Sequence, residues 1–197
     1  RAISVFSPLP AFSGIKIDVS ATDIVLTGSD SDISILSTIT PSEDNALTIN
    51  DVGSIVIEAK YILEVVRKIE GDIIEFEVLD DTQTRISGDR SQFKINGMKS
   101  TDYPAIDFSR PKDTFEIEAD TLKEIITQTC FAPSDRETRP VLTGVNFSCH
   151  DNQLQCVATD SYRLARKMIP LESALQFNIT IPAKSLQEVY KSISGEK

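Results

Sequence analysis

Two short segments decide the fold of this chain: Thr138-Arg139-Pro140-Val141-Leu142-Thr143-Gly144 and, a little later, Ala158-Thr159-Asp160-Ser161-Tyr162-Arg163-Leu164. Part of this framework also occurs near the N-terminus. The matching residues lie 130 positions apart: Pro10 with Pro140, Gly14 with Gly144, and Asp30 with Asp160. Apolar residues between these positions match as well, so the chain is predicted to contain an internal structural repeat.

A second block supports the same repeat. Residues 54–69 align with residues 178–193 at a spacing of 124 positions, and seven of the sixteen aligned positions are identical. The change of spacing indicates a longer loop in the first copy, around residues 41–45. A shorter match places Ile57-Glu58-Ala59 over Ile117-Glu118-Ala119. The repeating unit is therefore predicted to be a strand that enters a short helix, used three times.

The composition is that of an ordinary globular protein with an acidic surface. Of the 197 residues, 40% are apolar and 25% are charged, and the formal net charge is −10. No apolar run reaches the ~18 residues of a membrane span, and no signal peptide is recognisable at the start, so we expect a cytoplasmic location. Net negative charge disfavours indiscriminate nucleic-acid binding but is compatible with a local basic patch.

The cysteines and the single histidine form no recognisable catalytic or metal-binding pattern. Cys130, Cys149 and Cys156 lack CxxC spacing, which indicates buried free thiols, with a disulfide or metal site as the alternative. His150 precedes Asp151-Asn152, a combination typical of a turn. No GxxxxGK[ST], HExxH or GxSxG motif is present, so no standard catalytic set is recognisable and no cofactor or metal is expected.

Hydrophobic periodicity predicts an α+β fold made of hairpins and short helices. Strands are expected at residues 15–19, 24–28, 33–39, 47–50, 55–57, 73–79, 84–87, 92–96, 115–117, 142–149, 153–158, 163–169 and 177–181. Helices are expected at residues 59–70, after residue 117 with Leu122, Ile125, Ile126 and Thr129 facing inward, and at residues 183–194. A linker at residues 108–113 predicts domains at 1–109 and 110–197. By analogy with residues 73–104, further strands are expected after Lys197.

Three aspartates allow two interpretations. Asp30, Asp32 and Asp160 could supply the metal-binding or acid–base carboxylates of a metal-dependent hydrolase or nuclease. Asp30 and Asp160 also occupy the same place in each copy, between two strands, where an aspartate commonly caps a turn. The turn interpretation accounts for the repeat and is preferred.

Cations gather on the predicted helices at matching positions of the two copies. They are Lys60, Arg67 and Lys68 in the first copy, and Lys123, Lys184 and Lys191 in the second. A spacing of seven residues places Lys60 with Arg67, and Lys184 with Lys191, on one helix face. Such faces could contact phosphates without reading bases. A solvated helix face is the alternative.

Another candidate site surrounds Thr159. Leu142 and Leu164 are apolar, Thr159 and Arg163 are polar, and Tyr162 is amphipathic. If the strands that carry them are neighbours, these side chains could line a shallow groove that holds a short peptide anchor. Ordinary core plus turn is the alternative interpretation.

Taken together, the segments resemble one known family. Residues 138–145 followed by residues 157–165 resemble the second domain of the bacterial DNA polymerase III beta subunits, the sliding clamps. The likeness continues in order through residues 15–39, 53–69, 93–104 and 115–132. It implies tandem clamp-type domains with helices on one face of largely antiparallel sheets. It also implies a non-catalytic processivity factor that encircles duplex DNA as a ring-shaped homodimer and tethers the replicative polymerase.

The resemblance also implies roles for individual residues. The family's client-peptide pocket corresponds to Arg139, Leu142, Thr159, Tyr162, Arg163 and Leu164, with Tyr162 in place of a histidine often found there. Its channel-facing cations correspond to Lys60, Arg67, Lys68, Lys123, Arg136, Lys184 and Lys191. Its dimer edge corresponds to Tyr61, Val65, Phe93 and Ile95, with plain core as the alternative. The implied partners are duplex DNA, a clamp loader, and a polymerase and other clients that dock through short peptides. An acidic scaffold module of repeated domains is the remaining alternative.

Overall fold

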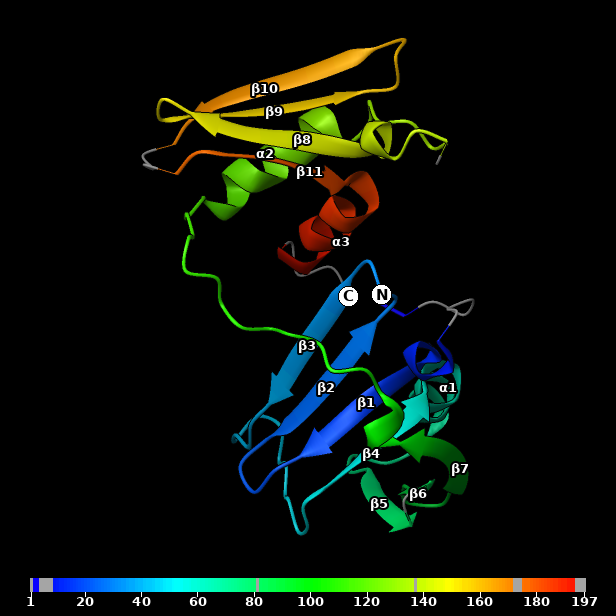
Figure 1. Cartoon of the computed structure of the whole chain (residues 1–197). Coiled ribbons are helices and arrows are strands. Elements are labelled where there is room, and N and C mark those ends of the chain that lie inside the picture. The colour runs from blue at the N-terminus through cyan, green and yellow to red at the C-terminus, as the bar shows by residue number, and fades with distance from the viewer. Residues whose placement is uncertain (1, 4–8, 81, 137, 172–174, 194–197) are drawn as a thin grey trace. The chain divides into compact units, whose positions relative to one another are not determined.

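The computed structural model describes residues 2–3, 9–80, 82–136, 138–171 and 175–193. The chain divides into two compact units, Arg1–Phe108 and Ser109–Lys197, which we call the first and second units (Figure 1). Each unit has its own sheet and its own core. No helix among the described residues is long and apolar enough to cross a membrane.

The first unit is built on an antiparallel sheet of seven strands in the order β3-β2-β1-β4-β7-β6-β5, so β3 and β5 are its edge strands. Its elements are the 3-10 helix η1 (Pro10–Ser13), β1 (Gly14–Val19), β2 (Ile24–Ser29), β3 (Ser34–Ile39), β4 (Gly53–Glu58), α1 (Ala59–Lys68), β5 (Glu75–Asp80), β6 (Gln83–Ser87), β7 (Gln92–Lys99) and the 3-10 helix η2 (Ser100–Asp102). The helix α1 packs on β4 and β7.

Strand β4 is buried on both faces. Ile55 and Ile57 point toward α1 and join a core that also contains Ile86 and Ile95. Val56 points to the opposite face, where η1 and the segment after η2 cover it. There the rings of Phe12 and Tyr103 meet edge to face, with centroids 5.4 Å apart. This double burial explains why β4 reads as a continuous apolar run, which is typical of a central strand.

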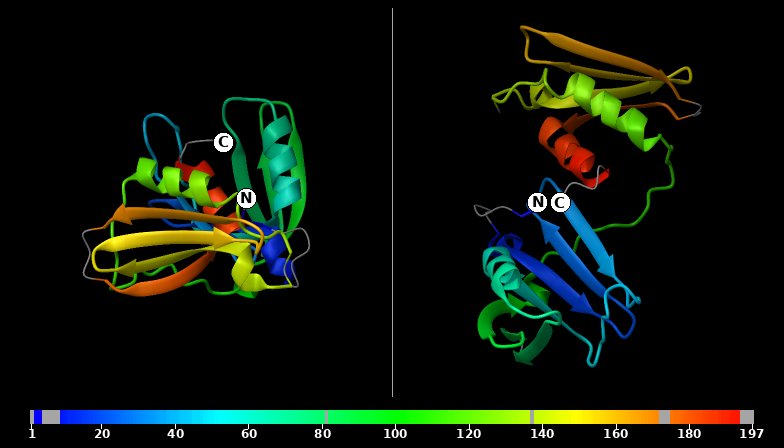
Figure 2. Two further views of the ribbon diagram at one scale, coloured as in Figure 1. Left: turned by 90° about the horizontal axis from the view of Figure 1, so that it is seen from above. Right: turned by 180° about the vertical axis from the view of Figure 1, so that it is seen from behind.

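The second unit consists of α2 (Ala119–Thr129), the 3-10 helix η3 (Pro140–Thr143), β8 (Gly144–His150), β9 (Gln153–Thr159), β10 (Leu164–Pro170), β11 (Phe177–Pro182) and α3 (Ala183–Ile193). Its antiparallel strands have the order β10-β9-β8-β11. Both helices lie on the same face of this sheet (Figures 1 and 2), where α2 contacts β9 and β10 and α3 contacts β8 and β11. Antiparallel sheets with helices on one face confirm the predicted α+β class.

The core of the second unit follows from alternation along two strands. Every second residue of β8 and β9 is buried, including Phe147, Cys149 and Leu154. These side chains meet Ile125 and Ile126 of α2. The predicted inward residues of α2 are thus confirmed, since Thr129 is buried and Leu122 packs against the core as well.

The predicted repeat is visible in matching backbone contacts. In each unit, the hydroxyl of the last residue of a 3-10 helix donates a hydrogen bond to the carbonyl of the first residue. Ser13 donates to Pro10 in η1, and Thr143 donates to Pro140 in η3, both over 2.7 Å. A strand then starts at a glycine. A Cβ atom added to Gly144 would lie 2.5 Å from the carbonyl oxygen of Ile181, and one added to Gly14 would lie 3.1 Å from that of Ile57. Glycine is required at both strand starts because the neighbouring strand approaches too closely for a side chain.

The longer loop also lies where the change of spacing placed it. Residues 40–52 connect β3 to β4, whereas residues 171–176 connect β10 to β11. Within the longer loop, the side-chain oxygen of Asn45 accepts hydrogen bonds from the N–H groups of Ser42 and Leu47, at 3.0 and 3.1 Å. The predicted strand at residues 47–50 is wrong, because both sides of the adjacent strand β4 are already paired with β1 and β7.

The strand predicted at residues 115–117 is also wrong, and the strand predicted from residue 142 starts at Gly144. The segment 115–117 has no ladder partner among the described residues and is held by side chains instead. Phe115 stacks on Phe177 with ring centroids 5.2 Å apart, and Ile117 packs against the core. Helix α2 still begins at Ala119, as α1 begins at Ala59. The strand-to-helix unit is complete in the other two predicted copies, where β4 leads into α1 and β11 leads into α3.

Candidate functional site

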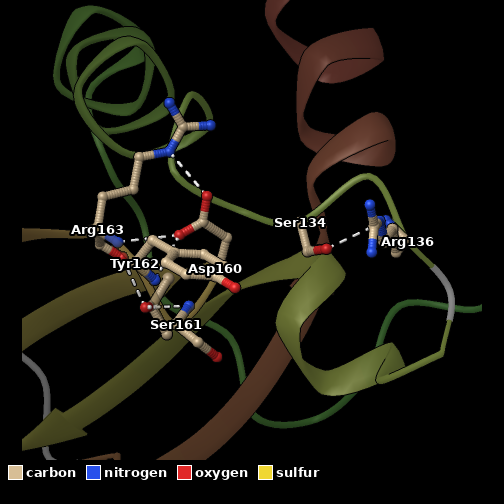
Figure 3. A network of polar contacts seen from close by, with 7 residues as sticks. Ser134, Arg136, Asp160, Ser161, Tyr162 and Arg163 are labelled. Carbon is tan, nitrogen blue, oxygen red and sulfur yellow. Dashed lines mark hydrogen bonds and ion pairs between the residues drawn. The ribbon is translucent and has the colours of Figure 1, made fainter.

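The turn between β9 and β10 is organised by one carboxylate. Oδ1 of Asp160 accepts hydrogen bonds from the backbone N–H groups of Tyr162 and Arg163, both at 2.9 Å, and Oδ2 lies 3.1 Å from Nε of Arg163 (Figure 3). These N–H groups stabilise the ionised form and lower the pKa of Asp160. Ser161 adopts a left-handed conformation, with φ of 80°. Asp160 therefore shapes the turn that presents Tyr162 and Arg163.

The equivalent turn of the first unit has the same design. Oδ1 of Asp30 accepts the N–H groups of Asp32 and Ile33, at 3.1 and 2.8 Å, and Ser31 has φ of 82°. The predicted turn role of both aspartates is thus confirmed. No group of three or more potential metal ligands occurs among the residues that the structure describes.

The most exposed apolar side chains of the second unit surround this turn. Among its described residues, the four that are more than half exposed are Tyr162 at 98%, Val141 at 68%, Leu164 at 64% and Phe131 at 58%. Strand register explains why they meet at one end of the sheet. Leu164 at the start of β10 pairs with Thr159 at the end of β9, and the adjacent strand β8 starts at the same end with Gly144, directly after the segment that contains Val141. We call this surface the end face; it comprises Phe131, Arg139, Val141, Leu142, Thr159, Tyr162, Arg163 and Leu164.

The loop after α2 is tied to the same end. The N–H group of Ser134 donates to the carbonyl of Leu142 over 2.8 Å, and the guanidinium carbon of Arg163 lies 5.9 Å from the ring centroid of Phe131. Thr159 contributes in another way, because its hydroxyl donates to the carbonyl of Arg163 over 2.6 Å and so braces the turn.

The six residues predicted for a peptide pocket therefore lie on or beside one face. Arg139 and Leu164 are exposed, and Leu142 is half-buried in η3 rather than in a strand. Sequence reasoning missed Phe131 and Val141. Val141 lies inside the most specific sequence segment and could have been found there. Phe131 could not, because only the fold brings it next to Arg163.

The predicted helix cations fall into two groups. Three have a carboxylate partner: Lys60 with Glu58 at 3.0 Å, Lys123 with Asp120 at 3.1 Å, and Lys191 with Glu188 at 2.7 Å. The hydrogen bond to Glu58 also raises the pKa of Lys60. The other three, Arg67, Lys68 and Lys184, are exposed and form no ion pair with another described residue. We call these sets the paired triple and the open triple.

Arg136 lies apart from the helix cations. It is exposed in the loop after α2, where its backbone N–H donates to the hydroxyl of Ser134 over 3.1 Å (Figure 3). Its position relates it to the end face rather than to the helix surfaces.

The residues predicted for a dimer edge are divided between surface and core. Ile95 is 7% exposed and belongs to the core of the first unit, and Val65 packs against that core. Tyr61 and Phe93 are exposed. Phe93 and Ile95 lie on β7, which is not an edge strand because it lies between β4 and β6. The edge strand on this side of the sheet is β5.

Two apolar side chains of β5 extend this surface to the true edge. Phe76 and Val78 are 47% and 46% exposed. Phe76 pairs with Ile86 of β6, and Ile86 pairs with Phe93 of β7, so the three residues form one row across the sheet. An apolar row that ends at an unpaired strand edge is typical of a surface that pairs with another chain.

The cysteines form no site with these groups. All three are free thiols; Cys149 and Cys156 are buried in the core, and Cys130 is half-buried at the end of α2. Burial raises the pKa of Cys156 to about 12, so its thiol stays protonated at neutral pH. The prediction of buried free thiols is thus confirmed for Cys149 and Cys156, whereas Cys130 is a free thiol that is only half-buried.

Comparison with known protein families identifies both units. The family model of the DNA polymerase III beta subunit, N-terminal domain, matches residues 1–107, and the model of its central domain matches residues 116–197. The chain belongs to the DNA polymerase III beta subunit family. The resemblance inferred from residues 138–165 is therefore confirmed.

Individual clamps agree with this assignment. The beta sliding clamp of Halalkalibacterium halodurans is 43% identical over 198 residues, covering 97% of this chain and 52% of the relative. That of Staphylococcus epidermidis is 39% identical over 197 residues, covering 98% and 52%. The chain spans about half the length of these relatives.

Solved clamp structures have the same fold. The DNA polymerase sliding clamp of Bacillus subtilis superposes with a TM-score of 0.90 at 40% identity, covering 96% of this chain and 51% of that one. The DNA polymerase III beta chain of Streptococcus pneumoniae gives a TM-score of 0.91 at 36% identity, covering 98% and 52%.

Proposed function

We propose that this chain acts as part of a DNA sliding clamp, a processivity factor that encircles duplex DNA and holds the replicative polymerase on its template. One observation carries the proposal: two consecutive units, matched by consecutive clamp-domain models, repeat a single framework down to the turns at Asp30 and Asp160. A ring built from repeated domains needs such a framework. The activity is mechanical rather than catalytic, and it belongs in the cytoplasm, where bacterial DNA is replicated.

The charge distribution suits a ring that slides. With a net charge of −10, most of the surface repels phosphate, whereas the open triple offers cations on α1 and α3. Contacts to phosphate carry no sequence information. A closed ring stays on DNA because it cannot leave, so a few weak phosphate contacts guide it without stopping it.

The end face is the proposed docking site for clients. Leu164 and Val141 offer apolar contact area, and Tyr162 and Arg163 add groups that donate hydrogen bonds. This mixture fits a short linear peptide with an apolar anchor and polar flanks. The polymerase is the first expected client, and a clamp loader is the second expected partner.

The edge of β5 is the proposed contact with a second subunit. Phe76, Val78 and Phe93 supply its apolar area, with Tyr61 on the adjacent helix. Ile95 and Val65 support this surface from the core beneath it. A homodimer closed through β5 would cover this exposed strand edge.

A topological experiment tests the ring. The full natural chain that contains these residues is loaded with a clamp loader onto nicked circular DNA and separated from free protein by gel filtration. We expect it to stay with the circular DNA and to be lost when a restriction enzyme makes the DNA linear. Equal retention on both forms indicates ordinary binding and contradicts the proposed function.

A second experiment tests the end face. Overlapping short peptides that tile the catalytic subunit of Bacillus subtilis DNA polymerase III are screened for binding to the full natural chain. The strongest peptide is then measured by fluorescence anisotropy against Leu164→Ala. Because burial of one large apolar side chain contributes about 1.5–3 kcal/mol, we expect affinity to fall about tenfold or more.

Met168→Ala is the matched control for this experiment. Met168 is an exposed apolar residue on the same strand, four positions beyond Leu164 and away from the turn. We expect its substitution to leave peptide affinity unchanged. Equal losses in the two variants mean that the end face is not the docking site.

The hydrolase or nuclease alternative gains no support. It requires carboxylates available to a metal or a substrate, whereas Asp30 and Asp160 each accept two backbone N–H groups within their own turns. The scaffold alternative predicts no dependence on DNA topology, so the retention experiment separates it from the clamp.

A further inference from the structure

Phe131 is an aromatic side chain that stands on the surface from a fixed backbone. Its ring is 58% exposed, more than that of any other described phenylalanine. The residues on both sides anchor the chain: Cys130 is half-buried, and Ala132 is fully buried with its N–H bonded to the carbonyl of Thr129 at 3.0 Å. The position of the ring is thus set by the end of α2.

The backbone of Arg163 is held at both of its polar groups. Its N–H donates to Oδ1 of Asp160 at 2.9 Å, and its carbonyl accepts from the hydroxyl of Thr159 at 2.6 Å. The turn therefore determines where this side chain leaves the strand.

Two further contacts act on the Arg163 side chain. Its Nε lies 3.1 Å from Oδ2 of Asp160, and its guanidinium carbon lies 5.9 Å from the ring centroid of Phe131. Figure 3 shows both terminal nitrogens of Arg163 on the side away from the Asp160 carboxylate. No hydrogen bond joins these terminal nitrogens to another residue in the described part of the chain.

We propose that Phe131 is a positioning residue of the end face. Its ring holds the Arg163 guanidinium in one orientation, so that the two terminal nitrogens present their N–H donors to a carboxylate or main-chain carbonyl of a docked peptide. The inference rests on the proposed docking function and adds a residue from α2 to a site otherwise formed by η3 and the β9–β10 turn.

The physical reason lies in the nature of the two groups. A guanidinium is planar and is attracted to the negative face of an aromatic ring, which an aliphatic side chain lacks. Asp160 fixes only one edge of the guanidinium, through Nε. Without the ring, the side chain regains alternative rotamers, and it must lose them again whenever a peptide binds.

The test measures affinity by fluorescence anisotropy in the full natural chain. The probe is the strongest peptide from the tiled array of DNA polymerase III. Phe131→Leu keeps an apolar side chain but removes the ring, and we expect affinity to fall about threefold, as for an exposed cation–π contact. Phe131→Tyr keeps the ring and is expected to bind like the unmodified protein.

A double-mutant cycle separates positioning from direct contact. In an Arg163→Met background, Phe131→Leu is expected to cause no further loss, because no guanidinium remains to be held. An equal loss in both backgrounds shows that the ring contacts the peptide itself, and it overturns the positioning role. Thermal unfolding midpoints of all variants control for general destabilisation.

The remaining outcomes separate the inference from the function on which it rests. If the unmodified chain binds no peptide of the array, the docking function fails, and the positioning role fails with it. If the unmodified chain binds and Phe131→Leu binds equally well, the docking function stands and the positioning role alone is overturned.

Discussion

Removal of the open triple is expected to weaken the dependence of DNA binding on salt. Arg67→Ala, Lys68→Ala and Lys184→Ala, combined in the full natural chain, remove three exposed cations without an ion-pair partner among the described residues. Each cation that neutralises a phosphate releases condensed counterions and contributes about 0.9 to the slope of log affinity against log salt. The variant should therefore lose about 2.7 from this slope for each subunit whose three cations contact DNA.

The paired triple provides a control of equal charge. Substituting its three lysines by alanine also removes three positive charges, so both variants change the formal net charge of these 197 residues from −10 to −13. Each lysine of the paired triple lies within 3.1 Å of a carboxylate oxygen. An ammonium that is already paired with a carboxylate neutralises little phosphate charge, so it releases few condensed counterions from the DNA. The salt slope should therefore change by less than about 1.

The assay is fluorescence anisotropy of a labelled short linear duplex, titrated at a series of salt concentrations. Short linear DNA removes the topological contribution and leaves the direct contacts. Equal changes of the salt slope in the two variants would refute the idea that ion pairing decides which cations contact DNA, because the loss of net charge alone would then explain both changes. No change in either variant would refute the assignment of these helix faces to DNA.

Two further predictions concern the fold. Gly144→Ala should destabilise the 197-residue chain by about 1–3 kcal/mol in chemical denaturation, because the new Cβ would lie 2.5 Å from the carbonyl oxygen of Ile181, whereas Gly53→Ala, with open space around it, should not. Iodoacetamide should alkylate half-buried Cys130 long before buried Cys156 in mass spectrometry. Because burial raises the pKa of Cys156 from its ordinary value of 9.0 to about 12, its contribution to stability should be present below pH 9 and be lost as pH rises toward 12.

Local spacing was sufficient for several features of the site. Asp30 and Asp160 could be assigned to turns because each lies between two predicted strands. The ion pair between Lys123 and Asp120 also follows from their separation of three residues on one helix. The ion pair of Lys167 with Glu124, which are 43 residues apart, could not be anticipated in this way.

Other predictions failed because a local pattern contains no information on partners. Residues 115–117 have the apolar alternation of a strand but no ladder partner in the described part of the chain, so they do not join the sheet. Val65 and Ile95 show the same ambiguity, since an apolar residue on a helix or strand can serve a core or an interface. In the first unit both pack with the core, and their place at a dimer edge stays a prediction.

The repeat, the α+β class and the family could be predicted without coordinates, because they depend on residue types at fixed spacings along the chain. Only the fold shows that β5 is an edge strand and that Phe76 extends the row of Phe93. It alone placed Phe131 beside Arg163. These are contacts between segments far apart in the chain, and the free energy that selects them comes from the packing of the whole unit rather than from any local stretch.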